Sequence, residues 1–223
     1  MDTMGSLLRP GKSQGVCLGR GIARCASPCW KPMSSVRSRQ RWRGTSAAAT
    51  VEQTYGRCDV LVNCAGYTRM VPHHDLEALD DELIDAIFAA NVRGPFATVR
   101  AFAPLMKQSG DAVIVNVSSV AAITGSGSNI AYGGSKAALD TMALSLARVL
   151  GPEIRVLTVS PAAVDTAFVP GRTTAMVERV AATTPLKRVV RADEVAQAIM
   201  AAITHLTSST GIVIPVDGGK LVG

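Results

Sequence analysis

The sequence has few aromatic residues and no long apolar run. Phe, Trp and Tyr make up 4% of the 223 residues, so Ala, Val, Ile and Leu must fill any core. No apolar run reaches the roughly 18 residues that span a bilayer, and the start does not resemble a secretory signal. We therefore expect no membrane partner and a chain long enough for one α/β domain.

Cysteine is scarce and irregularly spaced. The five cysteines are odd in number, which does not suggest a disulfide framework. Cys25 and Cys29 have no second Cys or His pair at zinc-site spacing. The three histidines, His73, His74 and His205, lie away from the motifs described below, so we predict surface positions for them and no metal site. A cytoplasmic, reducing location is the expected setting.

Acidic residues are almost absent from the first 50 residues. This segment holds nine of the 23 Lys and Arg residues and one of the 17 Asp and Glu residues, so its net charge is +8. Residues 51–223 have a net charge of −2. A nucleic-acid partner would need the segment to form a basic patch. Nothing in residues 51–223 supports such a partner, so we expect none.

Residues 51–223 alternate between apolar runs and helical stretches. Four short apolar runs predict strands, at 58–63, 112–117, 154–159 and 211–216. Three stretches predict helices, at 81–107, 132–150 and 192–206. Strands that are apolar without alternation are covered on both faces, and helices between them indicate a parallel sheet. The expected fold is a doubly wound, Rossmann-like α/β domain with its functional residues just after the strands.

Tyr132, Lys136 and Ser119 form the strongest chemical constellation. Tyr132 and Lys136 are four residues apart at a helix start, so they share one face. A nearby ammonium lowers a phenol pKa that is otherwise roughly 10, so Tyr132 can exchange a proton with an alcohol or carbonyl oxygen. Ser119 ends a predicted strand and can hydrogen-bond the same oxygen. Gly133 and Gly134 are expected to let a ligand approach the backbone.

The same Tyr-x-x-x-Lys spacing also arises by chance on amphipathic helices, and the neighbouring motifs decide between the two interpretations. They resemble, in order, those of the short-chain dehydrogenase/reductase family over residues 56 to about 219. Residues 61–66 are similar to its Asn-Asn-Ala-Gly segment, and Ser119 lies thirteen residues before Tyr132, the usual spacing in that family. Further matching segments are residues 91–94, 161–166, 185–188, 193–195 and 216–219.

The resemblance implies hydride transfer between NAD or NADP and a small alcohol or carbonyl substrate. Tyr132 would be the general acid/base, and Lys136 would bind the nicotinamide ribose. Ser119 would orient the substrate oxygen, and Asn91 would support a water-linked proton path. The implied cofactor-binding residues are Asn63, Ala65, Gly66, Tyr132, Lys136, Val164 and Thr166.

Two further expectations come from the same resemblance. Residues 123–130 and 167–174 should line the substrate pocket. Family members commonly form tetramers through the last helix and strand, so a homo-oligomer formed through residues 192–206 and 211–216 is implied. In the cofactor loop, Ala162 stands where the family has Gly, which is tolerable only if its φ is negative.

The first 50 residues depart from the family pattern. Residues 15–21 have the spacing Gly-x-x-x-Gly-x-Gly, but no strand-like run precedes them, and Pro28 and Pro32 would truncate the following helix. Residues 22–57 are too few for the other strands and helices that the family needs. We therefore predict that the first strands are incomplete or missing, that an apolar sheet edge is left exposed, and that residues 1–50 form an atypical, poorly ordered basic segment beside a catalytic domain at 51–223.

Several explanations of that segment remain open. It is a poorly packed tail, a mitochondrial-type presequence, a nucleic-acid-binding segment, or the product of a disrupted reading frame. We favour the last, because Arg, Cys, Trp, Ser and Pro appear so abruptly there. Two functions also remain open. All four catalytic positions carry the residues that the family uses, which favours an active oxidoreductase. The glycine-rich spacing lacks the strand and helix that should flank it, which favours a catalytically silent or truncated relative that binds no dinucleotide.

Overall fold

The computed structural model describes residues 17–19, 22–25, 44–171 and 173–223. In this part of the chain a six-stranded sheet has the order β1-β2-β3-β4-β5-β6. The strands are β1 (Cys17–Gly19), β2 (Ile22–Cys25), β3 (Val60–Asn63), β4 (Ala112–Val117), β5 (Ile154–Pro161) and β6 (Val213–Val216). Neighbouring strands from β2 to β6 pair in parallel, whereas β1 pairs antiparallel with β2.

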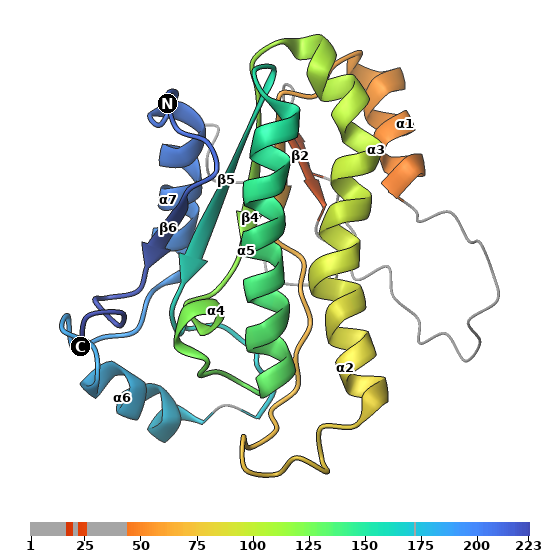
Figure 1. The fold of residues 1–223 in the computed structure, drawn as a ribbon. Helices are drawn as coiled ribbons and strands as arrows, with labels where there is room; N and C mark the ends of the chain where they lie inside the picture. Colours follow the sequence, from red (N-terminus) through yellow and green to blue (C-terminus); the bar gives the residue numbers. More distant parts are fainter. Residues whose placement is uncertain (1–16, 20–21, 26–43, 172) are drawn as a thin grey trace.

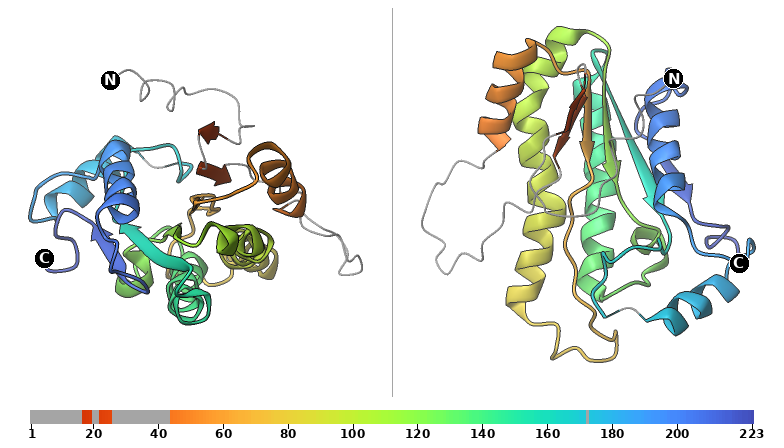
Figure 2. Two further views of the ribbon diagram at one scale, coloured as in Figure 1. Left: turned by 90° about the horizontal axis from the view of Figure 1, so that it is seen from above. Right: turned by 180° about the vertical axis from the view of Figure 1, so that it is seen from behind.

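Helices cover both faces of this sheet. They are α1 (Gly44–Tyr55), α2 (Asp81–Phe88), the π-helix η1 (Ala89–Arg93), α3 (Gly94–Ser109), α4 (Ala121–Thr124), α5 (Ile130–Leu150), α6 (Thr174–Ala182) and α7 (Ala192–Thr204). α1, α3 and α5 lie on one face and α7 lies on the other (Figures 1 and 2). This arrangement confirms the predicted doubly wound α/β fold.

The two faces of each strand bury apolar side chains in different clusters. Leu61 and Ile114 pack in the cluster beneath α1, α3 and α5. Val62 and Val115, their neighbours along β3 and β4, pack in the cluster beneath α7. Because both faces are covered, the strands need apolar residues at successive positions, which explains why their sequences do not alternate.

The sheet edge beside β3 differs from the expectation. All four residues of β3 pair in register with β2, so β3 does not present the open apolar edge that the sequence predicted. β2 has no long apolar run that would predict a strand, and backbone pairing does not need one. The two added strands have only three and four residues, so the start of the sheet is incomplete, as predicted.

The described part of the glycine-rich spacing, Cys17–Gly19, is the strand β1, which pairs antiparallel with β2; Gly15 and Gly21 lie outside the described residues. Gly19 of β1 pairs with Ile22 of β2, so the element after β1 is a strand and not the helix that binds pyrophosphate in a dinucleotide fold. Such a fold also reverses its parallel strand order, typically 3-2-1-4-5-6, and binds its ligand at the reversal. Within the described residues the strands simply follow sequence order.

The boundaries of the helices differ from the predicted ones for identifiable reasons. The helix predicted at 81–107 consists of α2, η1 and α3 in succession. α1 begins before residue 50 and packs Ala48 and Val51 into the core, so it crosses the composition change. α6 was not predicted, and none of its residues is buried. No helix in the described ranges is both long and apolar enough to cross a membrane.

Candidate active site

The candidate site lies where α5 begins, beside the carboxyl ends of β3 and β4. Asn129 caps α5, because its Oδ1 accepts a hydrogen bond of 2.7 Å from the backbone N–H of Tyr132. Asn129 Nδ2 also donates to the carbonyl of Arg69 at 2.7 Å. One side chain therefore fixes the first turn of α5 and ties it to the segment that follows β3.

Lys136 and Tyr132 come together as the sequence predicted. Lys136 is 4% exposed, and its Nζ donates to the Val117 carbonyl at 2.8 Å, at the end of β4. The same Nζ lies 5.7 Å from the centroid of the Tyr132 ring. The ring of Phe168 lies 6.2 Å from that of Tyr132, tilted by 53°. The ammonium therefore lies over the phenol ring, within the range of a cation–π contact.

Asn91 lies within the π-helix η1 and is fully buried. Its Oδ1 accepts from the backbone N–H of Tyr67 at 2.8 Å, and its Nδ2 donates to the Tyr67 carbonyl at 3.0 Å. The same Nδ2 donates to Ser135 Oγ at 3.0 Å, and Ser135 Oγ donates to the Tyr132 carbonyl at 2.8 Å. Asn91 thus joins the loop after β3 to the first turns of α5. π-turns inside helices often occur at functional sites.

Gly66 lies where three of these groups converge. A methyl group added there would lie 3.2 Å from Asn91 Oδ1, 3.6 Å from Phe168 Cζ and 3.7 Å from Lys136 Nζ. The first distance is shorter than ordinary packing permits, so a side chain would disturb Asn91. Glycine at this position therefore allows the loop after β3 to approach the candidate catalytic groups closely.

Ser119 lies at the same sheet edge, just after β4. Its Oγ accepts a hydrogen bond of 3.2 Å from the backbone N–H of Ala121 in α4, and the side chain is half-buried. The backbone of α4 thus orients the Ser119 hydroxyl just after the end of β4.

Gly133 lets two helices pack closely. A Cβ there would lie 3.2 Å from the Ala121 carbonyl, so the missing side chain allows α4 to pack against α5, and the approach of a ligand to this backbone stays a prediction. Gly134 is exposed, and a Cβ there would meet only the ring of Phe88, at 3.8 Å. α4 and the first turns of α5 lie side by side in Figure 1.

The predicted cofactor residues divide into two groups. Asn63 is buried and its Nδ2 donates to Asn116 Oδ1 at 2.9 Å, so its amide joins β3 to β4. Ala65 is exposed beside Gly66. Val164 is half-buried and bridges to Val190, while Thr166 is exposed, with its Oγ1 accepting from Phe168 N–H at 3.4 Å. Ala65, Val164 and Thr166 are thus placed where a ligand can reach them.

Burial controls the charge of Lys136. It lowers the Lys136 pKa from 10.5 to about 8, and interactions with Cys64 and Asp140 oppose this shift. At neutral pH the side chain therefore remains mostly an ammonium. Burial likewise raises the pKa of Asp140, while a hydrogen bond from Ser118 and the charge of Lys136 oppose the rise.

The sequence argument missed several residues of this site. Asp140 follows Lys136 by four positions on α5, which is helical spacing for a neighbour on the same face, and that signal was available. Asn129 is a preferred capping residue directly before the helix. Ser118 and Ser135 carried no signal beyond their position beside catalytic candidates. Ala162 meets its condition, because Lys187 is the one non-glycine residue with positive φ in the described ranges.

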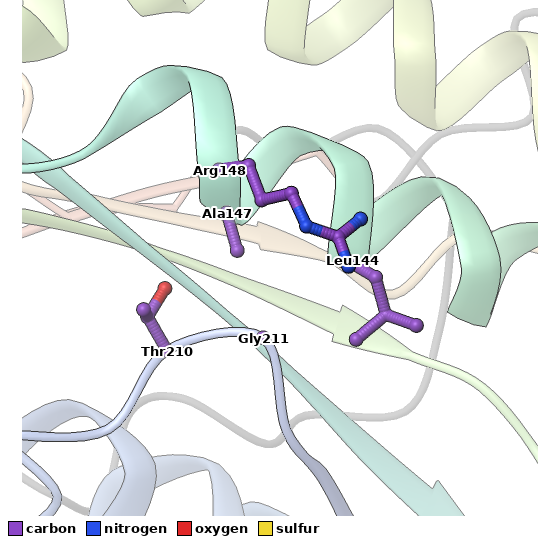
Figure 3. A pocket seen from close by; sticks show the side chains of 5 residues that line it. All are labelled: Leu144, Ala147, Arg148, Thr210 and Gly211. Atoms are coloured by element: carbon purple, nitrogen blue, oxygen red, sulfur yellow. The ribbon is translucent and has the colours of Figure 1, made fainter.

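Two other features lie away from this site. The three histidines are exposed, as predicted, and no group of three potential metal ligands occurs among the described residues. A hollow of about 300 Å³ lies between the later part of α5 and the chain that leads into β6. Figure 3 shows the residues around it, which are Leu144, Ala147, Arg148, Thr210 and Gly211. It is two to three helical turns from Lys136 and belongs to the opposite end of the sheet.

Comparison with known proteins identifies the family of the chain. The profile of a family described as enoyl-(acyl carrier protein) reductase matches residues 36–220. A 3-oxoacyl-[acyl-carrier-protein] reductase of Thermotoga maritima is 36% identical over 174 residues, which are 77% of this chain and 70% of that protein. An uncharacterized oxidoreductase of the same organism is 37% identical over 179 residues, again 77% of this chain and 70% of the relative.

A solved structure gives the same result for the fold. The crystal structure of a short-chain dehydrogenase/reductase, named as a glucose/ribitol dehydrogenase, from Brucella melitensis superimposes with a TM-score of 0.75 at 28% identity. The match covers 81% of this chain and 72% of that one. With the profile match over most of the sequence, these similarities show that the chain belongs to the short-chain dehydrogenase/reductase family.

Proposed function

We propose that this chain is an NAD(P)-dependent oxidoreductase that interconverts a small alcohol and its carbonyl compound. Membership of an oxidoreductase family supports the general class. The observation that carries the proposal is the position of the Lys136 Nζ, 5.7 Å from the centroid of the Tyr132 ring and held there by the Val117 carbonyl. The residues proposed to act are Asn91, Ser119, Tyr132 and Lys136.

Tyr132 is the proton donor in the direction of carbonyl reduction. The Lys136 ammonium stabilises the phenolate that remains after Tyr132 gives its proton to the carbonyl oxygen. In alcohol oxidation the phenolate takes the proton back. Lys136 is buried, so its charge acts through less solvent than an exposed lysine would, and the effect on the phenol is stronger.

Ser119 stabilises the same substrate oxygen. Its Oγ already accepts a hydrogen bond from Ala121 N–H, and this bond directs the hydroxyl so that its own O–H can donate to the substrate. Asn91 holds the surroundings in place. Its amide joins the Tyr67 backbone to Ser135, and these contacts keep Gly66 close to Lys136.

The residues present fit one end of a nicotinamide dinucleotide. Gly66 gives the close backbone approach that a flat ring needs, and Lys136, Val164 and Thr166 would hold the nicotinamide and its ribose. When bound, the nicotinamide supplies or accepts the hydride. The pyrophosphate end does not fit in the same way, because residues 17–19 and 22–25 form two strands where a glycine loop and helix are needed.

That mismatch favours a second candidate function. A relative that keeps the catalytic face but binds no dinucleotide would show the same Tyr132 and Lys136 geometry without turnover. The antiparallel pairing of β1 with β2 is the specific observation behind this alternative. The two candidates differ in one measurable property, which is dinucleotide affinity.

The deciding experiment measures cofactor binding and turnover by the full chain. NADH and NADPH are titrated against the protein by fluorescence, and oxidation of the bound form is followed with a panel of small ketones and aldehydes. Saturable binding with turnover that is lost in Lys136→Met supports the oxidoreductase. A folded protein that binds neither cofactor at millimolar concentration supports the silent relative.

We also propose that copies of the chain associate in the cytoplasm through α7 and β6. Met200 on α7 and Ile212 beside β6 are large apolar side chains that are exposed in the single chain. Light scattering coupled to size exclusion tests this, and replacing both residues with Lys should convert the oligomer to a monomer. A wild-type protein that elutes as a monomer would contradict the proposal.

A further inference from the structure

A carboxyl group lies between α5 and the sheet, one helical turn beyond Lys136. Asp140 is half-buried, and its Oδ1 is buried with no hydrogen-bond partner among the described residues. Carboxylates in such places are rare unless neighbouring groups stabilise them. The surroundings of Asp140 therefore decide whether it carries a charge.

The sheet face beneath α5 is polar at the carboxyl ends of its strands. Asn116 follows Ile114 by two positions and Thr158 follows Val156 by two, so both side chains lie on the face that α5 covers. Both are buried, and Asn116 Nδ2 and Thr158 Oγ1 have no hydrogen-bond partner in the described part of the chain. Neither donor hydrogen-bonds Asp140 Oδ1, so both act on the carboxyl only as dipoles of a polar layer.

Ser118 connects this layer to both charged residues. Its Oγ lies 3.3 Å from the Lys136 carbonyl, to which it donates a hydrogen bond, and its hydroxyl also interacts with the Asp140 carboxyl. A hydroxyl has a single proton, so these two acceptors compete for it. When the proton points to Asp140, it stabilises the carboxylate.

Lys136 has three titratable neighbours within the described residues. Tyr132 and Asp140 lie one turn to either side of it on α5, and Cys64 approaches from the loop after β3. Asp140 is the one carboxyl group among these three. Cys64 and Asp140 both favour the ammonium, with Cys64 the larger of the two, and Asp140 is the neighbour that can do so as a carboxylate.

We propose that Asp140 is a positioning residue that stays ionised beneath α5 and keeps Lys136 charged beside Tyr132. This role rests on the proposed function, because it matters for turnover only if Tyr132 exchanges protons with a substrate. The electrostatic coupling of the two side chains is a property of the folded chain itself. It can be measured without cofactor or substrate.

The first test compares Asp140→Asn with Asp111→Asn. Both changes remove one carboxylate with little change of shape, and Asp111 is exposed just before β4, at the end of that strand opposite to Val117, which Lys136 contacts. The pH titration of the Lys136 13Cε resonance, assigned by its disappearance in Lys136→Met, reports the ammonium directly. We expect the Lys136 midpoint to fall by about one pH unit in Asp140→Asn, a tenfold loss of the ammonium relative to the amine, and to stay unchanged in Asp111→Asn. An unchanged midpoint in a folded Asp140→Asn protein overturns the proposal.

A second measurement needs no variant at Asp140. In the wild-type chain the carboxyl 13C shift of Asp140 at pH 7 should be that of a carboxylate, and the shift of a neutral acid overturns the proposal. If the chain also turns over substrate, the pH profile of kcat should move in Asp140→Asn but not in Asp111→Asn. An inactive wild-type chain with the expected Lys136 shift would overturn the proposed function and leave the coupling standing.

Discussion

Asn91 holds both backbone groups of Tyr67, with its Oδ1 2.8 Å from the N–H and its Nδ2 3.0 Å from the carbonyl. This paired contact fixes the loop after β3 against the middle of the long helical segment. It also sets the position of Gly66, one residue earlier, relative to Lys136. The candidate site therefore depends on an amide that touches backbone on one side and α5 on the other.

Asn91→Ala should lower the free energy of unfolding by about 2–3 kcal/mol. The change removes three hydrogen bonds of a fully buried amide, two of them to the Tyr67 backbone, and each contributes about 1 kcal/mol. Urea unfolding followed by circular dichroism measures this. Ser135→Ala, which removes a single partner of Asn91, should cost about 1 kcal/mol, and an equal loss in the two variants would contradict the assignment.

Tyr132→Phe should abolish turnover without affecting the fold. The ring still packs near Phe168 and Lys136, but no hydroxyl is left to exchange a proton, so kcat should fall by about 10²- to 10⁴-fold. The matched control is Tyr55→Phe, which removes an exposed hydroxyl from α1. Residual activity within tenfold of the wild type in Tyr132→Phe would mean that another group carries the proton.

Lys136→Met should make the protein more stable at neutral pH. The folded-state pKa of Lys136 is lowered from 10.5 to about 8 by burial, so the buried charge costs about 3 kcal/mol. Loss of the bond to the Val117 carbonyl offsets about 1 kcal/mol of this gain. We therefore expect a net stabilisation of about 2 kcal/mol at pH 7.

The stability difference between Lys136→Met and the wild type should depend on pH. Between pH 8 and about 10.5 the unfolded chain binds the proton and the folded chain does not, so wild-type stability rises with pH across this window. The advantage of Lys136→Met is therefore full below pH 8 and shrinks above it. Lys107→Met, at an exposed position of α3, should show no such trend, and a parallel trend in both variants would contradict the burial argument.

The adjacent glycines of α5 offer a matched pair of substitutions. Gly134→Ala should raise stability by about 0.5–1 kcal/mol, since alanine favours the helix and the added methyl meets only Phe88 at 3.8 Å. Gly133→Ala places its methyl 3.2 Å from the Ala121 carbonyl, which cannot move without shifting α4. It should be about 1–3 kcal/mol less stable than Gly134→Ala. Thermal unfolding of the two proteins side by side measures the difference, and similar melting temperatures would refute it.

Local pattern was sufficient to predict β4, β5, β6 and α5 because each is strongly apolar and bounded by turn residues. The Tyr132–Lys136 pair followed from helical spacing alone. The start of the sheet could not be predicted in this way. β2 is a short strand without a long apolar run, and its pairing with β3 is a long-range contact that no local signal encodes.

The remaining misses concern contacts between distant segments. Gly133 packs against α4 because α4 folds back over α5. Residue spacing in the sequence does not predict this contact. The hydrogen bond between Asn63 and Asn116 joins residues 53 positions apart. The cofactor role of Asn63 is implied by the family resemblance and stays a prediction beside this hydrogen bond.

The π-turn at residues 89–93 makes this part of the helical segment tolerant of the loss of one residue. A π-turn bonds each residue to the fifth along, one more than an α-turn holds. Deleting one residue there would restore regular α-helix and leave α3 facing the core, so that Val99 and Phe102 keep their packing. The same deletion within regular α-helix would turn the residues after it by about 100°. The extra residue therefore matters less for the packing of α3 than for the local placement of Asn91, which lies within the π-turn.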